Sequence, residues 1–222
     1  MNDIKIDKII RSKRKTIGIE ITSEASLIVR VPLRTSLEHI KKIVDKKRFW
    51  IRKKQKTAKE KKNIPRKFVE GEKFLYLGNT YCLSIFNNPS PPLLFNQKFL
   101  LSRDYLPYAQ EIFVAWYKNQ AYYKIKERLD WYSTLSGLKY NGFKITNARK
   151  RWGSCNGKDR LCFSWRLIMT PLSVIDYVVV HELTHIVEKN HSKRFWHKLK
   201  IILPNYEESK KWLKENGYLL GI

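Results

Sequence analysis

The sequence predicts an α+β fold in which strands come first and helices later. Alternating, β-branched segments dominate residues 1–103, and an apolar period of three to four residues dominates residues 104–222. We therefore expect a β-rich N-terminal subdomain over 1–103, containing a long basic helix at 36–62, and a second domain over 104–222. In the second domain a buried helix is expected to pack on a small antiparallel sheet.

The segment 3–31 predicts two or three antiparallel strands, because IKIDKII and TIGIEITSEASLIVRVP alternate and are separated by polar turns. Thr35 and Glu38 then form a capping box that opens the helix at 36–62. One face of this helix is apolar and consists of Leu37, Ile40, Ile43, Val44 and Ile51.

Two hairpins and a long helix are expected next. Residues 73–86 alternate around a Gly-Asn turn, and residues 93–101 suggest a second, shorter hairpin. Residues 107–135 have the apolar period of a helix, which Ser136 and Gly137 end.

The remaining segment combines strands with a buried helix. Residues 140–168 predict strands with a tight Asn-Gly turn at 156–157. The segment 170–190 is ambiguous, because IDYVVV has strand propensity. However, Thr170 and Pro171 are a helix start, and about seventeen residues without a turn signal favour a buried helix. Ser192 can cap the following helix.

Charge is the strongest signal in the composition. The chain has 45 Lys and Arg against 20 Asp and Glu, a net charge of +25, and 20 of the basic residues lie in 1–62. Such a surface attracts polyanions, by counterion release where the partner is nucleic acid. The alternative is a solvated, lysine-rich surface with no such partner. The candidate nucleic-acid-binding residues are Arg48, Arg52, Lys53, Lys54 and Lys56.

No apolar run reaches the length of a membrane span, and the N-terminus lacks the apolar core of a signal peptide. We therefore expect a cytoplasmic protein with no membrane partner. Cys82, Cys155 and Cys162 contain no CxxC pair, which argues against a disulfide framework or a cysteine-based zinc site.

The segment 181–191, HELTHIVEKNH, holds three of the chain's five histidines. On a helix, His181 and His185 lie on one face and can bind a single ion, with zinc–nitrogen bonds of about 2.0–2.1 Å. Glu182 lies one step around the helix, where its carboxylate can act as a general base toward water. H-E-x-x-H also occurs by chance, but a buried helix makes unpaired histidines costly and a metal removes that cost.

A catalytic zinc site typically has three protein ligands and one open position. His191 is the preferred third ligand, because a short reversal after the helix can bring it back over the ion. Glu188, Glu207 and Glu208 are the rivals. His39 and His197 have unsuitable spacing. Manganese or iron could occupy the same three-histidine site.

Four segments of the chain resemble the YgjP-like family of zinc-dependent metallopeptidases, distant relatives of the SprT-like and WLM zincins. They are Trp152–Cys155 (WGSC), Ser164–Leu167 (SWRL, where the family pattern has Asn first), Val179–His185 (VVHELTH) and Asn190–Trp196 (NHSKRFW). The resemblance is dense from about 140 to 200 and looser over the whole chain. It implies a zincin-like catalytic part with one zinc ion on His181, His185 and His191, and with Glu182 as the catalytic carboxylate.

The strand that contains ARKRWGSC is the candidate for binding an extended peptide at a sheet edge, through Arg151, Trp152, Gly153 and Ser154. Alternatively, Trp152 and Trp165 are core aromatics and Gly153 is a bulge. The sequence thus predicts a zinc metallopeptidase that acts on peptides or proteins, near nucleic acid if the basic surface binds it. The alternatives are a nucleic-acid-binding protein with a structural zinc, and a zinc amidase or esterase.

Overall fold

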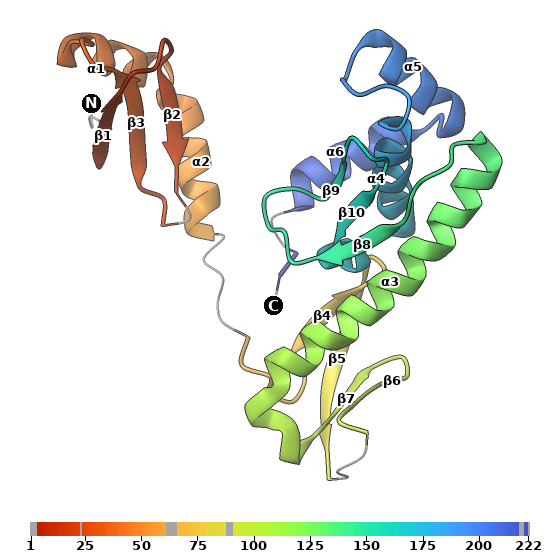
Figure 1. The fold of residues 1–222 in the computed structure, drawn as a ribbon. Coiled ribbons are helices and arrows are strands. Elements are labelled where there is room, and N and C mark those ends of the chain that lie inside the picture. The colour runs from red at the N-terminus through yellow and green to blue at the C-terminus, as the bar shows by residue number, and fades with distance from the viewer. Residues whose placement is uncertain (1–3, 23, 61–65, 88–90, 218–219, 222) are drawn as a thin grey trace. The chain divides into compact units, whose positions relative to one another are not determined.

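A computed structural model describes residues 4–22, 24–60, 66–87, 91–217 and 220–221, except for the side chains of 57–60. Its fold is α+β, as the sequence predicts, and its contacts separate into two compact units, Met1–Ile64 and Pro65–Ile222 (Figure 1). Each unit has its own cluster of buried apolar residues. Among the described residues, no helix combines the length and the apolar character that a membrane crossing requires.

The first unit contains a three-stranded sheet. Strands β1 (Lys8–Ser12), β2 (Gly18–Ile21) and β3 (Leu27–Pro32) lie in the order β1-β3-β2. Because β3 pairs antiparallel with β2 but parallel with β1, the all-antiparallel arrangement predicted for this segment is wrong. Burial explains the order: the side chains of Leu27, Val29 and Val31 are fully buried, so the strand with the most apolar inner face lies in the centre.

Two helices pack on this sheet where one was predicted at 36–62. They are α1 (Leu37–Lys46) and α2 (Arg48–Glu60), with a break at Lys47, and the predicted end at 62 lies outside the described residues. A single straight helix over these residues would be about 36 Å long. A strand of six residues extends only about 20 Å. The break therefore keeps both helices within reach of the small sheet, which buries Ile40, Val44 and Ile51.

The cap of α1 also differs by one residue from the prediction. Ser36 is the N-cap, and its hydroxyl accepts a hydrogen bond from the backbone N–H of His39 at 3.2 Å. Thr35 therefore does not cap the helix.

The second unit begins with two hairpins that form one sheet. Strands β4 (Lys73–Tyr76), β5 (Asn79–Phe86), β6 (Leu93–Phe95) and β7 (Phe99–Ser102) lie in the order β4-β5-β7-β6. Both predicted hairpins, β4–β5 and β6–β7, are confirmed, and β5 pairs with β7 in parallel. The first turn consists of Leu77 and Gly78, both at positive φ, one residue earlier than predicted.

This sheet belongs to the second unit, so the division of the chain falls after Ile64 and not after residue 103. Phe74 and Phe99 are fully buried against Phe113 of helix α3 (Ala109–Ser136), with ring centroids 4.4 and 5.1 Å from that of Phe113. A boundary at 103 would separate these rings and expose an aromatic core.

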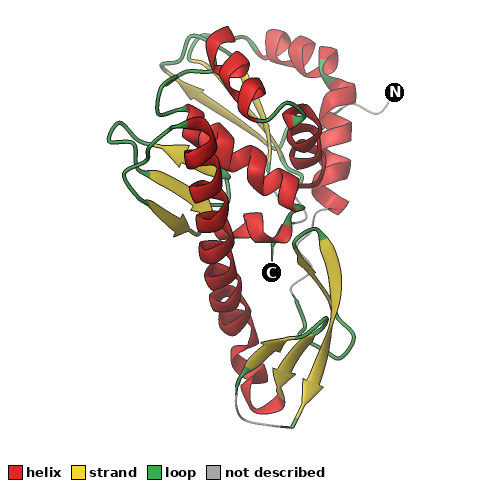
Figure 2. Cartoon of the chain, turned by 90° about the vertical axis from the view of Figure 1, so that its right-hand side faces the viewer, coloured by secondary structure: helices red, strands yellow, loops and turns green. Residues whose placement is uncertain are grey.

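Helix α3 confirms the helix predicted at 107–135, and a 3₁₀ helix, η1 (Arg103–Tyr108), precedes it. Figure 2 shows that α3 runs alongside both sheets of the second unit. Its buried face repeats every four residues and consists of Phe113, Tyr117, Ala121, Ile125 and Leu129. Gly137, in the left-handed conformation at φ 69°, ends the helix as predicted.

A second sheet follows, with strands β8 (Phe143–Thr146), β9 (Gly153–Cys155) and β10 (Leu161–Ser164) in the order β8-β10-β9. The sheet is mixed rather than antiparallel, because β10 pairs antiparallel with β9 but parallel with β8. Strands β9 and β10 are joined by residues 156–160, a longer loop than the predicted two-residue turn. The Asn156 side chain stabilises this loop, because its oxygen accepts hydrogen bonds from the backbone N–H groups of Lys158 and Arg160.

The last elements are a 3₁₀ helix η2 (Trp165–Met169), where a strand was predicted, and the helices α4 (Leu172–Thr184), α5 (Lys193–Ile202) and α6 (Tyr206–Asn216). The ambiguous segment is therefore a helix, as expected, but it ends earlier than expected. Thr170 does not cap α4, because its hydroxyl donates to the carbonyl of Leu167. Ser192 caps α5 as predicted and accepts a hydrogen bond from the N–H of Phe195.

Candidate metal centre

Helix α4 is fixed by burial and by one ion pair. Residues 174–180 are all buried, between α3, α6 and the sheet β8-β10-β9. Arg128 of α3 donates from two nitrogens to the carboxylate of Asp176, at 2.5 and 3.0 Å. Sequence reasoning missed this pair. The signal was available, however, since a lone acidic residue inside an apolar helical segment requires a partner.

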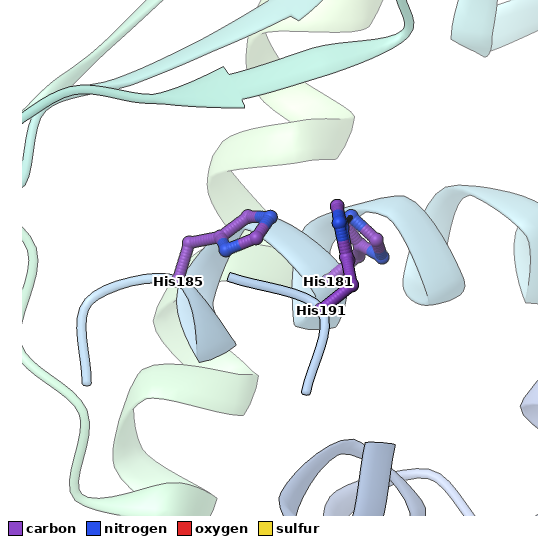
Figure 3. Close-up of side chains that lie close together, drawn as sticks. All are labelled: His181, His185 and His191. Carbon is purple, nitrogen blue, oxygen red and sulfur yellow. Dashed lines mark hydrogen bonds between the residues drawn. The ribbon is translucent and has the colours of Figure 1, made fainter. Parts of the chain in front are cut away.

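Three imidazoles meet beside the C-terminal end of α4. His181 lies in its last turn, His185 immediately follows it, and His191 comes from the loop before α5 (Figure 3). One nitrogen from each ring lies within 4.8 Å of the others, and the Nε2 atoms of His181 and His191 are 2.9 Å apart. Among the described residues, this is the one group of three or more His, Cys, Asp or Glu side chains that could hold a metal ion.

The loop after α4 orients two of these rings. The Nδ1 atom of His185 lies 2.9 Å from the backbone carbonyl oxygen of Glu188, so Nδ1 is the protonated nitrogen and Nε2 is left as the ligand atom. Asn190 accepts a hydrogen bond from the N–H of Ser192 at 3.1 Å, which shapes the turn that carries His191. Glu188 therefore contributes its carbonyl group to the site. Its carboxylate is not part of the metal-binding group.

Phe195 supports all three imidazoles from one side. Its ring is fully buried, and its centroid lies 4.9 Å from that of His181, 4.7 Å from that of His185 and 4.8 Å from that of His191. In the sequence, Phe195 is one of several apolar residues in the helix after Ser192, at the spacing of a core face. Its contact with each candidate ligand shows that α5 positions the rings as well as closing the core.

Glu182 is buried next to the three histidines, and its Oε2 atom has no hydrogen-bond partner among the described residues. Burial raises the pKa of its carboxyl group to about 8, and the positive charge of Arg151 opposes this shift. A buried carboxyl group without a partner is costly, so it is expected to serve a group that does not belong to the chain.

Burial also lowers the pKa of His181 to about 3, and the charges of His185, His191 and Lys210 act in the same direction. His181 is therefore neutral at physiological pH, which is the form that binds a metal. Its Nδ1 atom is buried and has no partner within the described part of the chain. Three convergent imidazoles and an unpaired carboxyl group thus fit a divalent ion of the kind that nitrogen ligands select.

Of the predicted substrate-binding residues, Gly153 lies directly beside Glu182. It opens strand β9, which is an edge strand of its sheet, and a Cβ atom at this position would be 2.6 Å from Oε1 of Glu182. Trp152 lies against Gly217 at the end of α6, where a Cβ would be 2.8 Å from the indole ring. Ser154 is opposite Cys162 in the ladder, and Arg151 is exposed.

We expect Gly153→Ala to lower any metal-dependent activity of this site by about 10- to 100-fold without loss of a bound metal, because the new methyl group must displace the Glu182 carboxylate and a shift of about 1 Å has this cost. The measurement is kcat together with the metal content of each variant. Gly157→Ala is the matched control, since a Cβ there meets nothing within 4 Å. Equal activity of the two variants would contradict the close approach of β9 to Glu182.

Lys210 is a site residue that the sequence did not reveal. Its ammonium group lies 3.8 Å from the ring centroid of Trp196, which in turn stacks on His191 with centroids 5.7 Å apart. Tyr206, four residues earlier on α6, stacks on the same Trp196 ring and also on Tyr177 of α4. The spacing of Tyr206 and Lys210 indicates a shared helix face, but nothing in the sequence shows what that face contacts.

The predicted nucleic-acid-binding residues Arg48, Arg52, Lys53, Lys54 and Lys56 all lie on α2, in the unit that ends at Ile64. His39 lies on α1 and His197 on α5, and neither joins the histidine group. All three cysteines are free, as expected.

A family model described as the YgjP-like metallopeptidase domain matches residues 15–216. The chain belongs to the YgjP-like family. Comparisons with curated proteins and with solved structures gave no match. Because the YgjP-like model covers most of the chain and its description is a metallopeptidase domain, membership supports a metal-dependent hydrolase in general. The histidine group could hold the metal ion of such an activity.

Proposed function

We propose that this YgjP-like protein is a zinc metallopeptidase with a zincin-like catalytic part, in which His181, His185 and His191 hold one zinc ion per chain. The observation that carries the proposal is the convergence of three imidazole nitrogens within 4.8 Å beside a buried, unpaired carboxyl group. Three protein ligands and an open fourth position are the pattern of a catalytic zinc site. A structural zinc would require a fourth protein ligand, and among the described residues none joins the group.

A zinc ion at this site supplies a Lewis acid that polarises a substrate carbonyl group and lowers the pKa of water toward about 7. Glu182 is the general base: its carboxylate accepts a proton from the attacking water as the oxygen bonds to the carbonyl carbon. As the C–N bond breaks, the same carboxyl group delivers that proton to the leaving amine. Burial raises the pKa of Glu182, and the positive charge of a bound metal ion would lower it again, toward the ionised form that accepts the proton.

Strand β9 is the proposed binding site for the peptide. Its outer edge is unpaired within the sheet order β8-β10-β9, so an extended substrate can add to it through backbone hydrogen bonds. Gly153 allows the substrate backbone to approach Glu182, while Arg151, Trp152 and Ser154 flank the same edge. We further propose that the protein is cytoplasmic, and that the basic first unit associates with nucleic acid.

The proposal is tested by metal analysis of the purified protein, followed by hydrolysis assays. We expect about one zinc per chain, and cleavage of unfolded proteins or peptides. A panel of small amides and esters separates a peptidase from an amidase or esterase acting at the same metal. A protein that contains no metal and takes up no added zinc, manganese or iron would refute the hydrolase. A protein that holds zinc but hydrolyses nothing in the panel would favour a structural zinc.

A further inference from the structure

The outward surface of helix α2 combines cations with an exposed aromatic ring. Ile51 is fully buried under the helix, and the side-chain amide of Gln55 donates to the carbonyl of Ala25 at 3.0 Å, so these two residues define the inner face. Phe49, Arg52, Lys53 and Lys56 have the spacing i, i+3, i+4 and i+7, so they share one face of α2, whose centre lies about 130° around the helix from the inner face. We call these four residues the outer face of α2. All four are exposed.

Phe49 is unusual in this position. Its side chain is 76% exposed, and among the described residues it does not belong to the unit's apolar core or to the residues packed against that core. Trp50, beside it, is 43% exposed. The guanidinium carbon of Arg48 lies 5.1 Å from the centroid of the Phe49 ring. Single exposed apolar residues are common on proteins, but here a flat ring lies within a row of cations on one helix face.

We propose that the outer face of α2 binds single-stranded nucleic acid, with Phe49 stacked on an unpaired base and the neighbouring Arg and Lys side chains on the phosphates. This inference rests on the nucleic-acid association proposed above and specifies its form. A positively charged surface that follows the backbone, combined with an aromatic side chain on which a base stacks, is the general design of sequence-tolerant single-strand binding.

A double strand fits this surface less well. In a duplex the base faces are already stacked on one another, so Phe49 would gain no partner, and only the phosphate contacts would remain. A membrane surface also fits less well. An interfacial helix lays a broad apolar face into the lipid, whereas the apolar residue Ile51 of α2 points into the protein core and the outer face is mostly charged.

The test is fluorescence anisotropy of the full chain with a labelled mixed-sequence DNA single strand, and with the same strand annealed to its complement. Phe49→Ala is expected to weaken single-strand binding by about 5- to 150-fold, because stacking of one base on an aromatic ring contributes that much. Phe49→Trp should retain the affinity and Phe49→Leu should lose it, since only an aromatic ring stacks. Duplex binding should be weaker and unchanged by Phe49→Ala.

The matched control is Leu37→Ala on α1, because Leu37 is a similarly exposed apolar residue of the same unit, at 58%. It should leave single-strand binding unchanged. Equal losses in the two alanine variants, full binding by Phe49→Leu, or tighter binding of the duplex would overturn the proposal. Phe49-dependent binding to anionic vesicles with no affinity for DNA would identify a membrane surface instead. Failure to bind any nucleic acid refutes this inference together with the nucleic-acid association on which it rests. It leaves the metallopeptidase proposal untouched, because the zinc content and the hydrolysis of peptides do not depend on it. Binding that does not depend on Phe49 refutes this inference alone.

Discussion

Glu182→Gln is expected to lower the hydrolytic activity by at least about 10²- to 10⁴-fold while the protein keeps its metal. Glutamine has nearly the same shape as glutamate, so it leaves the packing against Gly153 unchanged. It cannot accept the proton of the attacking water or deliver a proton to the leaving amine. The loss should therefore appear in kcat, whereas the metal content and the thermal unfolding midpoint stay close to those of the wild type.

Glu188→Gln is the matched control for this experiment. Glu188 lies in the same short segment of the chain, but it contacts His185 through its backbone carbonyl, which the substitution preserves. Its activity should remain near the wild-type value. If Glu182→Gln retained full activity, Glu182 would not be the general base, and a structural role for the metal would gain support.

His191→Ala is expected to weaken metal binding by more than about 100-fold, because it removes one of three ligands, and the loss of partners that merely orient ligands already costs 10- to 100-fold. The measurement is a competition titration with a chromophoric chelator, together with the metal content after dialysis. Activity should fall in parallel with metal occupancy at low zinc and recover in part at high zinc.

His197→Ala controls for the removal of an imidazole from this region, since His197 lies on α5 outside the histidine group. It should bind metal like the wild type. The rival ligands Glu188, Glu207 and Glu208 are tested in the same way. If His191→Ala bound metal normally and a variant of one of these glutamates bound it more weakly, that glutamate, and not His191, would be the third ligand.

The residues of the candidate site were predictable from sequence because they depend on local geometry. A helix places His181 and His185 on one side whatever surrounds it, and Ser192 indicates where the next helix begins. The structure brings His191 to the same place. The roles assigned to these residues, and the identity of the metal, stay predictions until they are measured.

The supporting contacts were not predictable, because they depend on which elements pack together. Nothing local to Phe195 indicates that its ring contacts three imidazoles, and nothing local to Lys210 places it over Trp196.

The same limitation explains the errors in the predicted pairing of the strands. Alternation identifies a strand but not its neighbour, so the parallel pairs β1–β3 and β8–β10 were expected to be antiparallel. The predicted boundary at residue 103 also depended on a change of local pattern, whereas the division into units depends on the aromatic contacts between Phe74, Phe99 and Phe113.

The position of the three candidate ligands, at and just after the end of α4 at Thr184, has a consequence for the order in which this protein would fold and bind a metal ion. All three candidate ligands lie within the segment 181–191, so a bound ion would close only a short loop of the chain. The buried residues of the core that holds α3 and α4 together all lie outside the loop 185–191 that follows α4. Metal loading is therefore expected to follow folding rather than to drive it, in contrast to small zinc domains that are unfolded without their metal. In a cell, the metal-free chain would then be folded but inactive, and the concentration of the free metal ion would set the fraction of the protein that is active.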